Sequence, residues 1–267
     1  SPTLEVFFCL KDTSMNIIEI EQASRFSWPS LEEQQLPIGI FRYAAGANRC
    51  LSTVTPNLEI WVDPQEMKVK TEKFFKKRNL PPKIRLLKGS PIDPLQLGIL
   101  DDSLKIAGYC MEAPSRMMAL NLDPYEPESQ VCPHGDRHYS GPNDWVRAWH
   151  HLRKHDHDLL PIHRVTLAKI TDPCCFLLFQ DYLSQPVASG FAVLHNRALG
   201  IHGIATSKHN LREGYATKLV NQLLHWGKRK GARYAYLQVE SANVTALNLY
   251  TKLGFNEVYK YWYRARY

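Results

Sequence analysis

The stretch that decides the fold is residues 201–255, IHGIATSKHNLREGYATKLVNQLLHWGKRKGARYAYLQVESANVTALNLYTKLGF. Its opening residues, Ile201 to Ala205, predict a strand, and small residues at Gly214 and Ala216 form a turn before an amphipathic helix. Small residues let the backbone turn tightly and present successive N–H groups, and the start of a helix adds partial positive charge. Because such a turn offers ready donors to phosphate, we expect it to hold a phosphorylated cofactor.

The residues after this turn predict two helices and two strands. Apolar residues at three- and four-residue spacing predict a helix that ends at Gly231, and Tyr234 to Val239 supplies the next strand. A second helix, Val244 to Leu253, has Asn243 as its N-cap and is followed by the last strand, Phe255 to Arg264. This pattern predicts an α+β fold with a largely antiparallel sheet.

The segment 123–144 is rich in proline and glycine and predicts a linker between two domains, residues 1–122 and residues 145–267. In the first domain we expect strands and helices at 4–10, 16–26, 38–44, 49–55, 64–78, 83–88, 101–107 and 109–122. In the second, a helix at 145–152 precedes strands at 176–182, 187–194 and 198–205.

Charge is concentrated at the C-terminal end of the chain. The whole chain has a formal net charge of +7, whereas residues 207–267 hold eleven basic and three acidic side chains, 11 − 3 = +8. A basic region around the predicted phosphate turn favours a small polyanionic ligand, and nucleic acid is a possible but not favoured partner. A solvated surface would also explain much of this charge.

The cysteine and histidine patterns predict a cytoplasmic protein without a bound metal. The six cysteines form no CxxC pair, so we expect reduced thiols. Cys132, His134 and His138 lie close together, but their spacing matches no four-ligand zinc pattern. The apolar run 4–10 is too short to span a bilayer and lacks the flanks of a secretion signal. Because the chain begins with Ser1, its true N-terminus is not defined.

Two motifs in this stretch resemble those of the GNAT superfamily of acetyl-CoA-dependent N-acetyltransferases. The family loop has the pattern Gln/Arg-x-x-Gly-x-Gly/Ala, which reads here as 211–216, LREGYA. The later motif, Asn-x-x-Ala-x-x-x-Tyr-x-x-x-Gly-Phe, is matched by Asn243, Ala246, Tyr250 and 254–255. Leu211 departs from the family preference for Gln or Arg, and Arg212 is displaced from that position by one residue.

The first half resembles the opening of two-domain members of this superfamily, at 28–29 (WP), 39–42 (GIFR) and 46–49 (GANR). A helix end and strand start at 107–109 (AGY) mirror 253–255 (LGF), which suggests duplication. The first half has no counterpart of the phosphate turn. The resemblance therefore implies a tandem protein with a degenerate first GNAT-like domain that lacks a cofactor site.

The resemblance implies a set of residues around acetyl-CoA. Gly200 and Gly203 in the strand before the turn indicate a bulge or a close approach of another chain, which in the family is pantetheine paired to the main chain. The expected cofactor-binding residues are Ile204, Ala205, Thr206, Leu211, Arg212, Glu213, Gly214, Tyr215, Ala216, Thr217, Asn243, Ala246 and Tyr250. The two glycines would equally serve to relieve crowding under the helix, and Asn243 would equally serve as a cap alone.

For the reaction, the resemblance implies direct attack of a primary amine in a ternary complex, with Tyr250 as the general acid. A phenol is protonated at neutral pH, so it can donate a proton to a departing thiolate without tuning. A backbone N–H within 203–205 is the expected oxyanion donor. Glu240, His202 or a chain of water molecules are the candidates for the base, and each side chain also has an ordinary structural explanation.

Three functions fit these residues. The first is acetyl transfer to the primary amine of a small molecule, with the acceptor cleft shaped by both halves. The second is a CoA-binding or regulatory module that has lost catalysis, suggested by Leu211 and the undefined base. The third is acetyl transfer to a protein or an aminoacyl-tRNA, suggested by the basic C-terminal third. The sequence does not define the acceptor or the oligomeric state.

Overall fold

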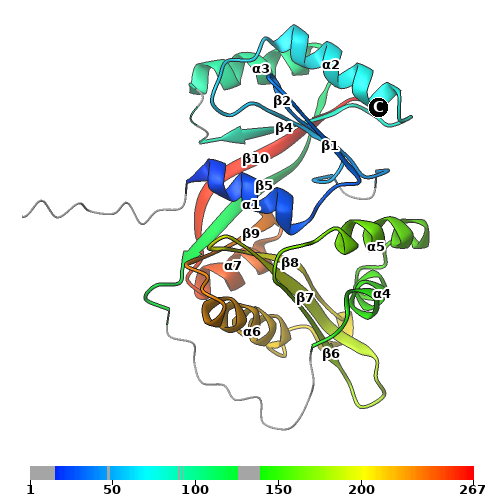
Figure 1. Ribbon diagram of the computed structural model, residues 1–267, viewed down its shortest axis with the longest axis vertical. Coiled ribbons are helices and arrows are strands. Elements are labelled where there is room, and N and C mark those ends of the chain that lie inside the picture. Colours follow the sequence, from blue (N-terminus) through cyan, green and yellow to red (C-terminus); the bar gives the residue numbers. More distant parts are fainter. Residues whose placement is uncertain (1–15, 47–48, 90, 92, 126–138) are drawn as a thin grey trace, which may run out of the picture.

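The computed structural model describes residues 16–46, 49–89, 91, 93–125 and 139–267 (Figure 1). The first half of the chain contains α1 (Ile17–Ser27), β1 (Glu32–Leu36), β2 (Gly39–Tyr43), β3 (Val54–Pro56), α2 (Pro64–Lys76), β4 (Lys83–Lys88), α3 (Pro94–Ile106) and β5 (Cys110–Asn121). The second half contains α4 (Pro142–Arg153), the 3-10 turn η1 (His157–Leu159), α5 (Leu160–Ala168), β6 (Cys174–Gln180), β7 (Pro186–His195), β8 (Ala198–Thr206), the 3-10 turn η2 (Lys208–Asn210), α6 (Tyr215–Arg229), β9 (Tyr234–Glu240), α7 (Val244–Lys252) and β10 (Asn256–Ala265).

The ten strands form one sheet in the order β1-β2-β3-β4-β10-β5-β9-β8-β7-β6. Neighbouring strands are antiparallel except for two parallel pairs, β3 with β4 and β8 with β9. The expected α+β fold with a largely antiparallel sheet is therefore confirmed.

Each half contributes its last strand to the other half. β10 lies between β4 and β5, and β5 lies between β10 and β9 (Figure 1). In both halves a helix precedes this strand and ends at a glycine with positive φ, Gly108 at 84° and Gly254 at 90°. The matching C-terminal ends of α3 and α7 support the duplication expected from the sequence. The division into domains at residues 123–144 stays a prediction, and the sheet that the two halves share runs through both.

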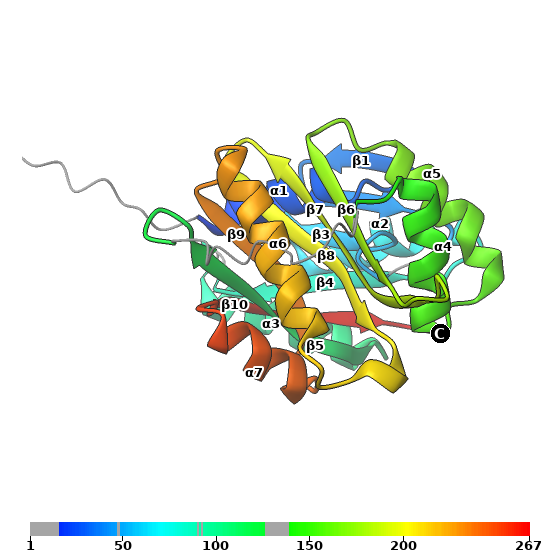
Figure 2. The ribbon, with the colours of Figure 1, turned by 90° about the horizontal axis from the view of Figure 1, so that it is seen from below.

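Helices cover both faces of the second half of the sheet, as the alternation of side chains on β7 requires. Ala188 and Ala192 belong to the apolar cluster that contains the buried face of α6, including Leu219 and Leu223. The alternate residues Phe191 and Val193 belong to a cluster with α4. Helix α6 therefore crosses one face of β6–β8 (Figure 2), whereas α4 and α1 pack on the other face.

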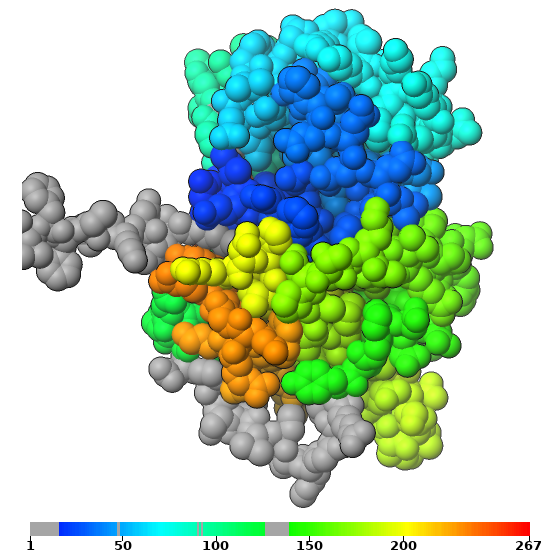
Figure 3. Space-filling view, in the orientation of Figure 1, coloured from blue at the N-terminus to red at the C-terminus, as the bar shows by residue number. Residues whose placement is uncertain are grey.

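Helix α1 lies at the seam between the halves (Figure 3). Ile20 and Ala23 of this helix pack with Tyr236 of β9 and with the tyrosines of β10. An asparagine cap with a full capping box starts the helix at Asn16. The first half therefore supplies a wall directly above the strands that carry the predicted site.

The structure corrects several expected elements. The prediction of a strand at 49–55 is wrong for most of its length, because only Val54–Pro56 forms a strand. The helix expected at 101–107 is present but begins earlier, at Pro94. β1 and α5 were not expected. β1 (EEQQL) is an exposed edge strand without apolar alternation, and Pro161, which indicates a helix end, occupies the first turn of α5. The strand expected at 4–10 lies outside the described residues.

Other local predictions are confirmed. Asn243 caps α7 through its side chain, and Gly231, at a φ of 92°, follows the end of α6. Cys50, Cys110, Cys174 and Cys175 are free thiols, whereas Cys9 and Cys132 lie outside the described residues. Within the ranges that the structure describes, no helix is long and apolar enough to cross a membrane.

Candidate active site

The centre of the site is a gap that opens between the parallel strands β8 and β9. The two strands pair from Ala198 with Tyr234 to Ile201 with Leu237. Beyond this point both strands continue, to Thr206 and Glu240, and no further pairs are formed between their described residues. The main chain of each strand is therefore available to a ligand placed between them.

A bulge at Gly203 produces part of this separation. Ser189 of β7 pairs with Ala205, but Phe191 pairs with His202, so β8 carries one extra residue here. Gly203 has a φ of 63°, and a Cβ atom at this position would lie 2.6 Å from the ring of the fully buried Trp145. The bulge expected from the strand glycines is confirmed at Gly203, and it leaves 203–204 without a register partner on either neighbouring strand.

Gly200 has a different reason to lack a side chain. A Cβ atom there would lie within 2.7 Å of the Tyr236 hydroxyl, the His202 Nε2 atom and the Ser27 Oγ atom. Tyr236 and Ser27 are hydrogen-bonded at 2.7 Å across the two halves of the chain. Relief of crowding, which the sequence left open, therefore explains Gly200.

The turn before α6 has the form expected of an anion site. Arg212 and Gly214 have positive φ values of 66° and 81°, and Gly214 is the N-cap of α6 without a side-chain cap hydrogen bond. The first turn of α6, 215–217, contains no acidic residue, and the first bond of the helix runs from the Lys218 N–H to the Gly214 carbonyl. The N–H groups of this first turn therefore point out of the helix without intrahelical partners.

The remaining residues of this turn are open to solvent. Leu211 is 58% exposed, and Arg212, Glu213 and Gly214 are also exposed. An added Cβ atom at Gly214 would meet no atom within 4 Å. A diphosphate therefore has free access to this turn, and Leu211 offers it no polar side chain.

A cleft with an internal volume of about 420 Å³ occupies the gap between the two strands. Ile201–Ile204 of β8 and Leu237–Glu240 of β9 line it, together with Asn243, Ala246 and Tyr250 of α7. The cleft thus brings together all three predicted catalytic residues, His202, Glu240 and Tyr250. Of the predicted cofactor-binding residues, Ile204, Asn243, Ala246 and Tyr250 line it, whereas Ala205, Thr206 and the residues of 211–217 do not.

Tyr250 is held on the wall of the cleft by the packing of α7. Its side chain is only 6% exposed and packs against Phe255, with 6.1 Å between ring centroids. Burial raises the pKa of Tyr250 to about 12, and the nearby charge of Arg153 opposes this rise. The phenol is therefore fully protonated at neutral pH and can donate a proton into the cleft.

Asn243 and Glu240 lie at the end of β9. The Asn243 side chain accepts the N–H of Ala246 at 3.1 Å, which leaves its amide NH₂ group for a ligand. The Glu240 side chain is 59% exposed and forms an ion pair with Arg49 of the first half at 3.0 Å. Glu240 is therefore solvated and lies at the point where the first half meets the cleft.

His202 projects from β8 into a set of aromatic rings. The ring centroids of Phe191, Trp28 and Tyr236 lie 5.1, 6.1 and 6.2 Å from that of His202, and the Nε2 atom of His202 is buried without a hydrogen-bond partner among the described residues. This burial lowers the pKa of His202 to about 4, so its imidazole is neutral at neutral pH. A neutral imidazole can accept a proton, but one with this pKa is a weak base.

Several residues of the cleft were not identified from the sequence. Trp149 and Arg153 come from α4, and Ser24, Trp28, Arg42, Cys50 and Leu51 come from the first half. Trp28 and Arg42 belong to segments that resemble two-domain family members, but nothing in the sequence assigned any of these residues to the cleft, which they reach through the packing of α4 and of the first half on β8. Arg153 is in the last turn of α4, where a basic residue ordinarily complements the helix dipole.

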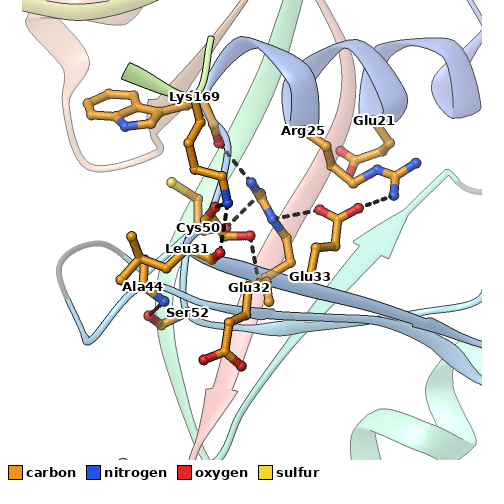
Figure 4. Close-up of polar contacts among 12 residues, drawn as sticks. Glu21, Arg25, Leu31, Glu32, Glu33, Ala44, Cys50, Ser52 and Lys169 are labelled. Atoms are coloured by element: carbon orange, nitrogen blue, oxygen red, sulfur yellow. Dashed lines mark hydrogen bonds and ion pairs between the residues drawn. The ribbon is translucent and has the colours of Figure 1, made fainter. Parts of the chain in front are cut away.

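Polar contacts fix the first half above the cleft (Figure 4). The buried Arg42 donates to the carbonyls of Cys50 at 3.0 Å and Trp28 at 2.7 Å. Lys169, just after α5, donates to the carbonyls of Ser30 and Leu31 at 2.8 and 2.7 Å (Figure 4). Arg42 of the first half and Lys169 of the second thus donate charge-assisted hydrogen bonds to main-chain carbonyls of the first half and hold the segment after α1 in place over the site.

Comparison with known proteins gives a consistent family relationship. The family model described as "Probable histone acetyltransferase Rv0428c C-terminal" matches residues 13–264. The uncharacterized N-acetyltransferase YobR of Bacillus subtilis (strain 168) is 20% identical over 259 residues, which is 94% of this chain and 99% of the relative.

Two solved structures show the same fold at low sequence identity. A GCN5-related N-acetyltransferase from Kribbella flavida aligns with a TM-score of 0.63 at 14% identity, over 94% of this chain and 96% of that chain. A tandem GNAT protein from the clavulanic acid biosynthesis pathway aligns with a TM-score of 0.55 at 12% identity, over 76% of this chain and 68% of that chain. The two-half arrangement therefore recurs in known GNAT structures.

Proposed function

This chain belongs to the acetyltransferase family described as "Probable histone acetyltransferase Rv0428c C-terminal" and is a GNAT-type N-acetyltransferase; from this premise we propose that it transfers an acetyl group from acetyl-CoA to the primary amine of a small molecule. The observation that carries the proposal is the gap between β8 and β9, which is lined by Tyr250. The chain that forms one side of this gap, β8, leads through 207–213 to the uncapped start of α6.

The described residues fit acetyl-CoA, which supplies the acetyl thioester for the reaction. The uncapped start of α6 would hold the diphosphate through the N–H groups of 214–217, with Arg212 adjacent. The main chain of Ile204–Thr206 and the amide group of Asn243 would hold the pantetheine in the gap, where β8 has no partner on β9. The absence of an acidic residue from the first turn of α6 supports this assignment.

Two groups on the cleft wall would act in the transfer step. The main-chain N–H groups at 203–204, without a register partner on either side, are placed to donate to the acetyl oxygen as it gains negative charge. Tyr250 would donate its proton to the departing sulfur, in keeping with a phenol that stays protonated at neutral pH. Arg153, close enough to influence Tyr250, would stabilise negative charge at the same place.

We assign the base to Glu240 in preference to His202. The carboxylate of Glu240 is exposed at the cleft edge, where it can pass a proton to solvent, whereas the imidazole of His202 is enclosed by aromatic rings and its burial lowers its pKa to about 4. We expect Glu240→Gln to lower kcat/KM by about tenfold to a hundredfold, and His202→Gln to change it by less than about threefold. Steady-state kinetics at saturating acetyl-CoA measures both, and the reverse order would contradict the assignment.

The proposed function is tested by measuring cofactor binding and turnover on the same preparation. Acetyl-CoA at one hundred times its dissociation constant should stabilise the fold by about 2.7 kcal/mol, which a thermal melt detects. A panel of amino acids, polyamines, amino sugars and peptides, histone peptides included, should then show amine-dependent release of the CoA thiol. A protein that neither gains thermal stability from acetyl-CoA nor releases thiol with any amine would contradict the function.

A further inference from the structure

The cleft adjoins a second cavity that lies within the first half of the chain. This cavity has an internal volume of about 170 Å³ and is walled by α1, by β1–β4 and by the loop at 57–59. Four residues line both cavities: Ser24, Arg42, Cys50 and Gln238. The second cavity therefore adjoins the cleft, on the side of the first half, and these four residues form the wall that the two cavities share.

The ionic groups of the second cavity are almost all paired with one another. Arg85 binds both carboxylate oxygens of Glu21, which also accepts the hydroxyl of Tyr259. Arg25 and Arg42 both pair with Glu33, at 2.8 and 3.3 Å. The pairing of Arg25 with Glu33 is drawn in Figure 4. These three arginines are balanced by Glu21, Glu33 and the carboxylate of Glu59 at the cavity edge, so the cavity has little net charge to attract an ionic ligand.

One charged lining residue is an exception. Glu59 is exposed at the edge of the cavity and has no ion-pair partner among the residues that the structure describes. Its own main-chain N–H is bonded to the side chain of Asn57 at 2.9 Å. A single solvated carboxylate attracts a cation only weakly, so it does not give the cavity an anionic character.

The uncharged polar side chains of the cavity are free to bind a ligand. Gln22, Gln35 and Thr55 line the cavity, and their side chains form no hydrogen bond with the described residues. At the junction with the cleft, Gln238 is fixed by Ser24 at 3.0 Å and by Tyr261 at 2.7 Å. The cavity therefore offers side-chain amides and hydroxyls, which both donate and accept hydrogen bonds.

From these contacts we propose that the acceptor is a primary amine on an uncharged scaffold rich in hydroxyl or amide groups. The scaffold occupies the cavity of the first half, and the amine reaches the cleft at the shared wall, where the Ser24–Gln238 hydrogen bond would open to admit it. Apart from Glu59 at the edge, each charged side chain of the cavity has an ion-pair partner, so a polyamine or a dicarboxylic amino acid would find little counter-charge there. Neither compound would form the hydrogen bonds that the side chains of Gln22, Gln35 and Thr55 offer. This inference rests on the proposed function, and it specifies the substrate class of the same site.

The test compares four acceptors with the full-length protein and acetyl-CoA. Glucosamine provides hydroxyls, serinamide provides an amide, spermidine provides positive charge and glutamate provides negative charge. We expect kcat/KM for glucosamine or serinamide to exceed the values for spermidine and glutamate by at least about tenfold, the size of effect expected from one or two additional hydrogen bonds. The better of the two neutral amines identifies which scaffold the cavity accepts.

A pair of variants locates the effect in the cavity. Gln35→Leu should raise KM for the preferred neutral amine about tenfold and leave KM for acetyl-CoA unchanged. Gln34→Leu is the matched control, because Gln34 is the preceding residue of β1, faces the other side of the strand and does not line the cavity. Both positions are exposed, so both variants should melt at the wild-type temperature.

The outcomes separate this inference from the proposed function. If acetyl-CoA raises the melting temperature but spermidine or glutamate is the best acceptor, or none of the four amines is acetylated, the inference is overturned and the cofactor assignment stands. Equal effects of the Gln35 and Gln34 variants overturn it as well. If acetyl-CoA neither binds nor is consumed with any amine, the proposed function and the inference fall together.

Discussion

Tyr250→Phe should lower kcat by about a hundredfold or more, because general-acid assistance contributes roughly 10²–10⁴-fold to such reactions. The substitution removes only the hydroxyl, and the ring would keep its packing against Phe255. The dissociation constant of acetyl-CoA should therefore stay within about threefold of the wild-type value. Single-turnover kinetics, with binding measured by calorimetry, separates the two quantities.

The pH profile provides the control for this prediction. The folded pKa of Tyr250 is raised to about 12, so the phenol stays protonated and the wild-type rate should not decline from its ionisation below that pH. Phe255→Leu would disturb the packing of the Tyr250 ring and leave the Tyr250 hydroxyl in place. A Tyr250→Phe enzyme with unchanged kcat would remove this residue as the acid and leave the proton to solvent.

Ala216→Asp should weaken acetyl-CoA binding by about thirtyfold or more and at the same time stabilise the free protein. Ala216 is in the first turn of α6, which has no acidic residue and no side-chain cap. An aspartate there would interact favourably with the helix dipole by about 0.3–1 kcal/mol, whereas a negative charge beside a bound diphosphate would cost about 2 kcal/mol. Thermal melts of the free protein and calorimetry with acetyl-CoA measure the two effects.

Ala216→Asn is the matched control, because it has nearly the same shape without the charge. The difference between the two variants should shrink at high ionic strength, where charges near the surface are screened. If the aspartate and asparagine variants bind acetyl-CoA equally well at low salt, the diphosphate does not lie at the start of α6.

The sequence predicted the second half well because its signals are local. Asn243 caps its helix and Gly203 forms a bulge, and each of these depends on a few neighbouring residues. The spacing of 243–255 likewise placed Tyr250 on α7, and the packing of that helix brings the side chain to the cleft. The correct predictions for this part of the site thus came mostly from residues with specific backbone preferences, such as the cap Asn243 and the bulge Gly203.

The first half of the site was not predictable in this way. β5 and β10 pair across the two halves, with a sequence separation of more than a hundred residues, and no local pattern encodes that register. Local signals also missed β1, because its residues are polar, and α5, because a proline in its first turn resembles a helix end. Arg42, Cys50 and Arg153 consequently reach the cleft through tertiary packing alone, and the second cavity could be found only in the structure.

A crystal structure with acetyl-CoA tests the central claim most directly. The account predicts that the diphosphate oxygens lie within hydrogen-bonding distance of the N–H groups of 214–217, that the pantetheine runs between β8 and β9, and that the thioester sulfur lies beside the Tyr250 hydroxyl. A cofactor bound in the cavity of the first half, or one whose diphosphate contacts only side chains away from the start of α6, would contradict it.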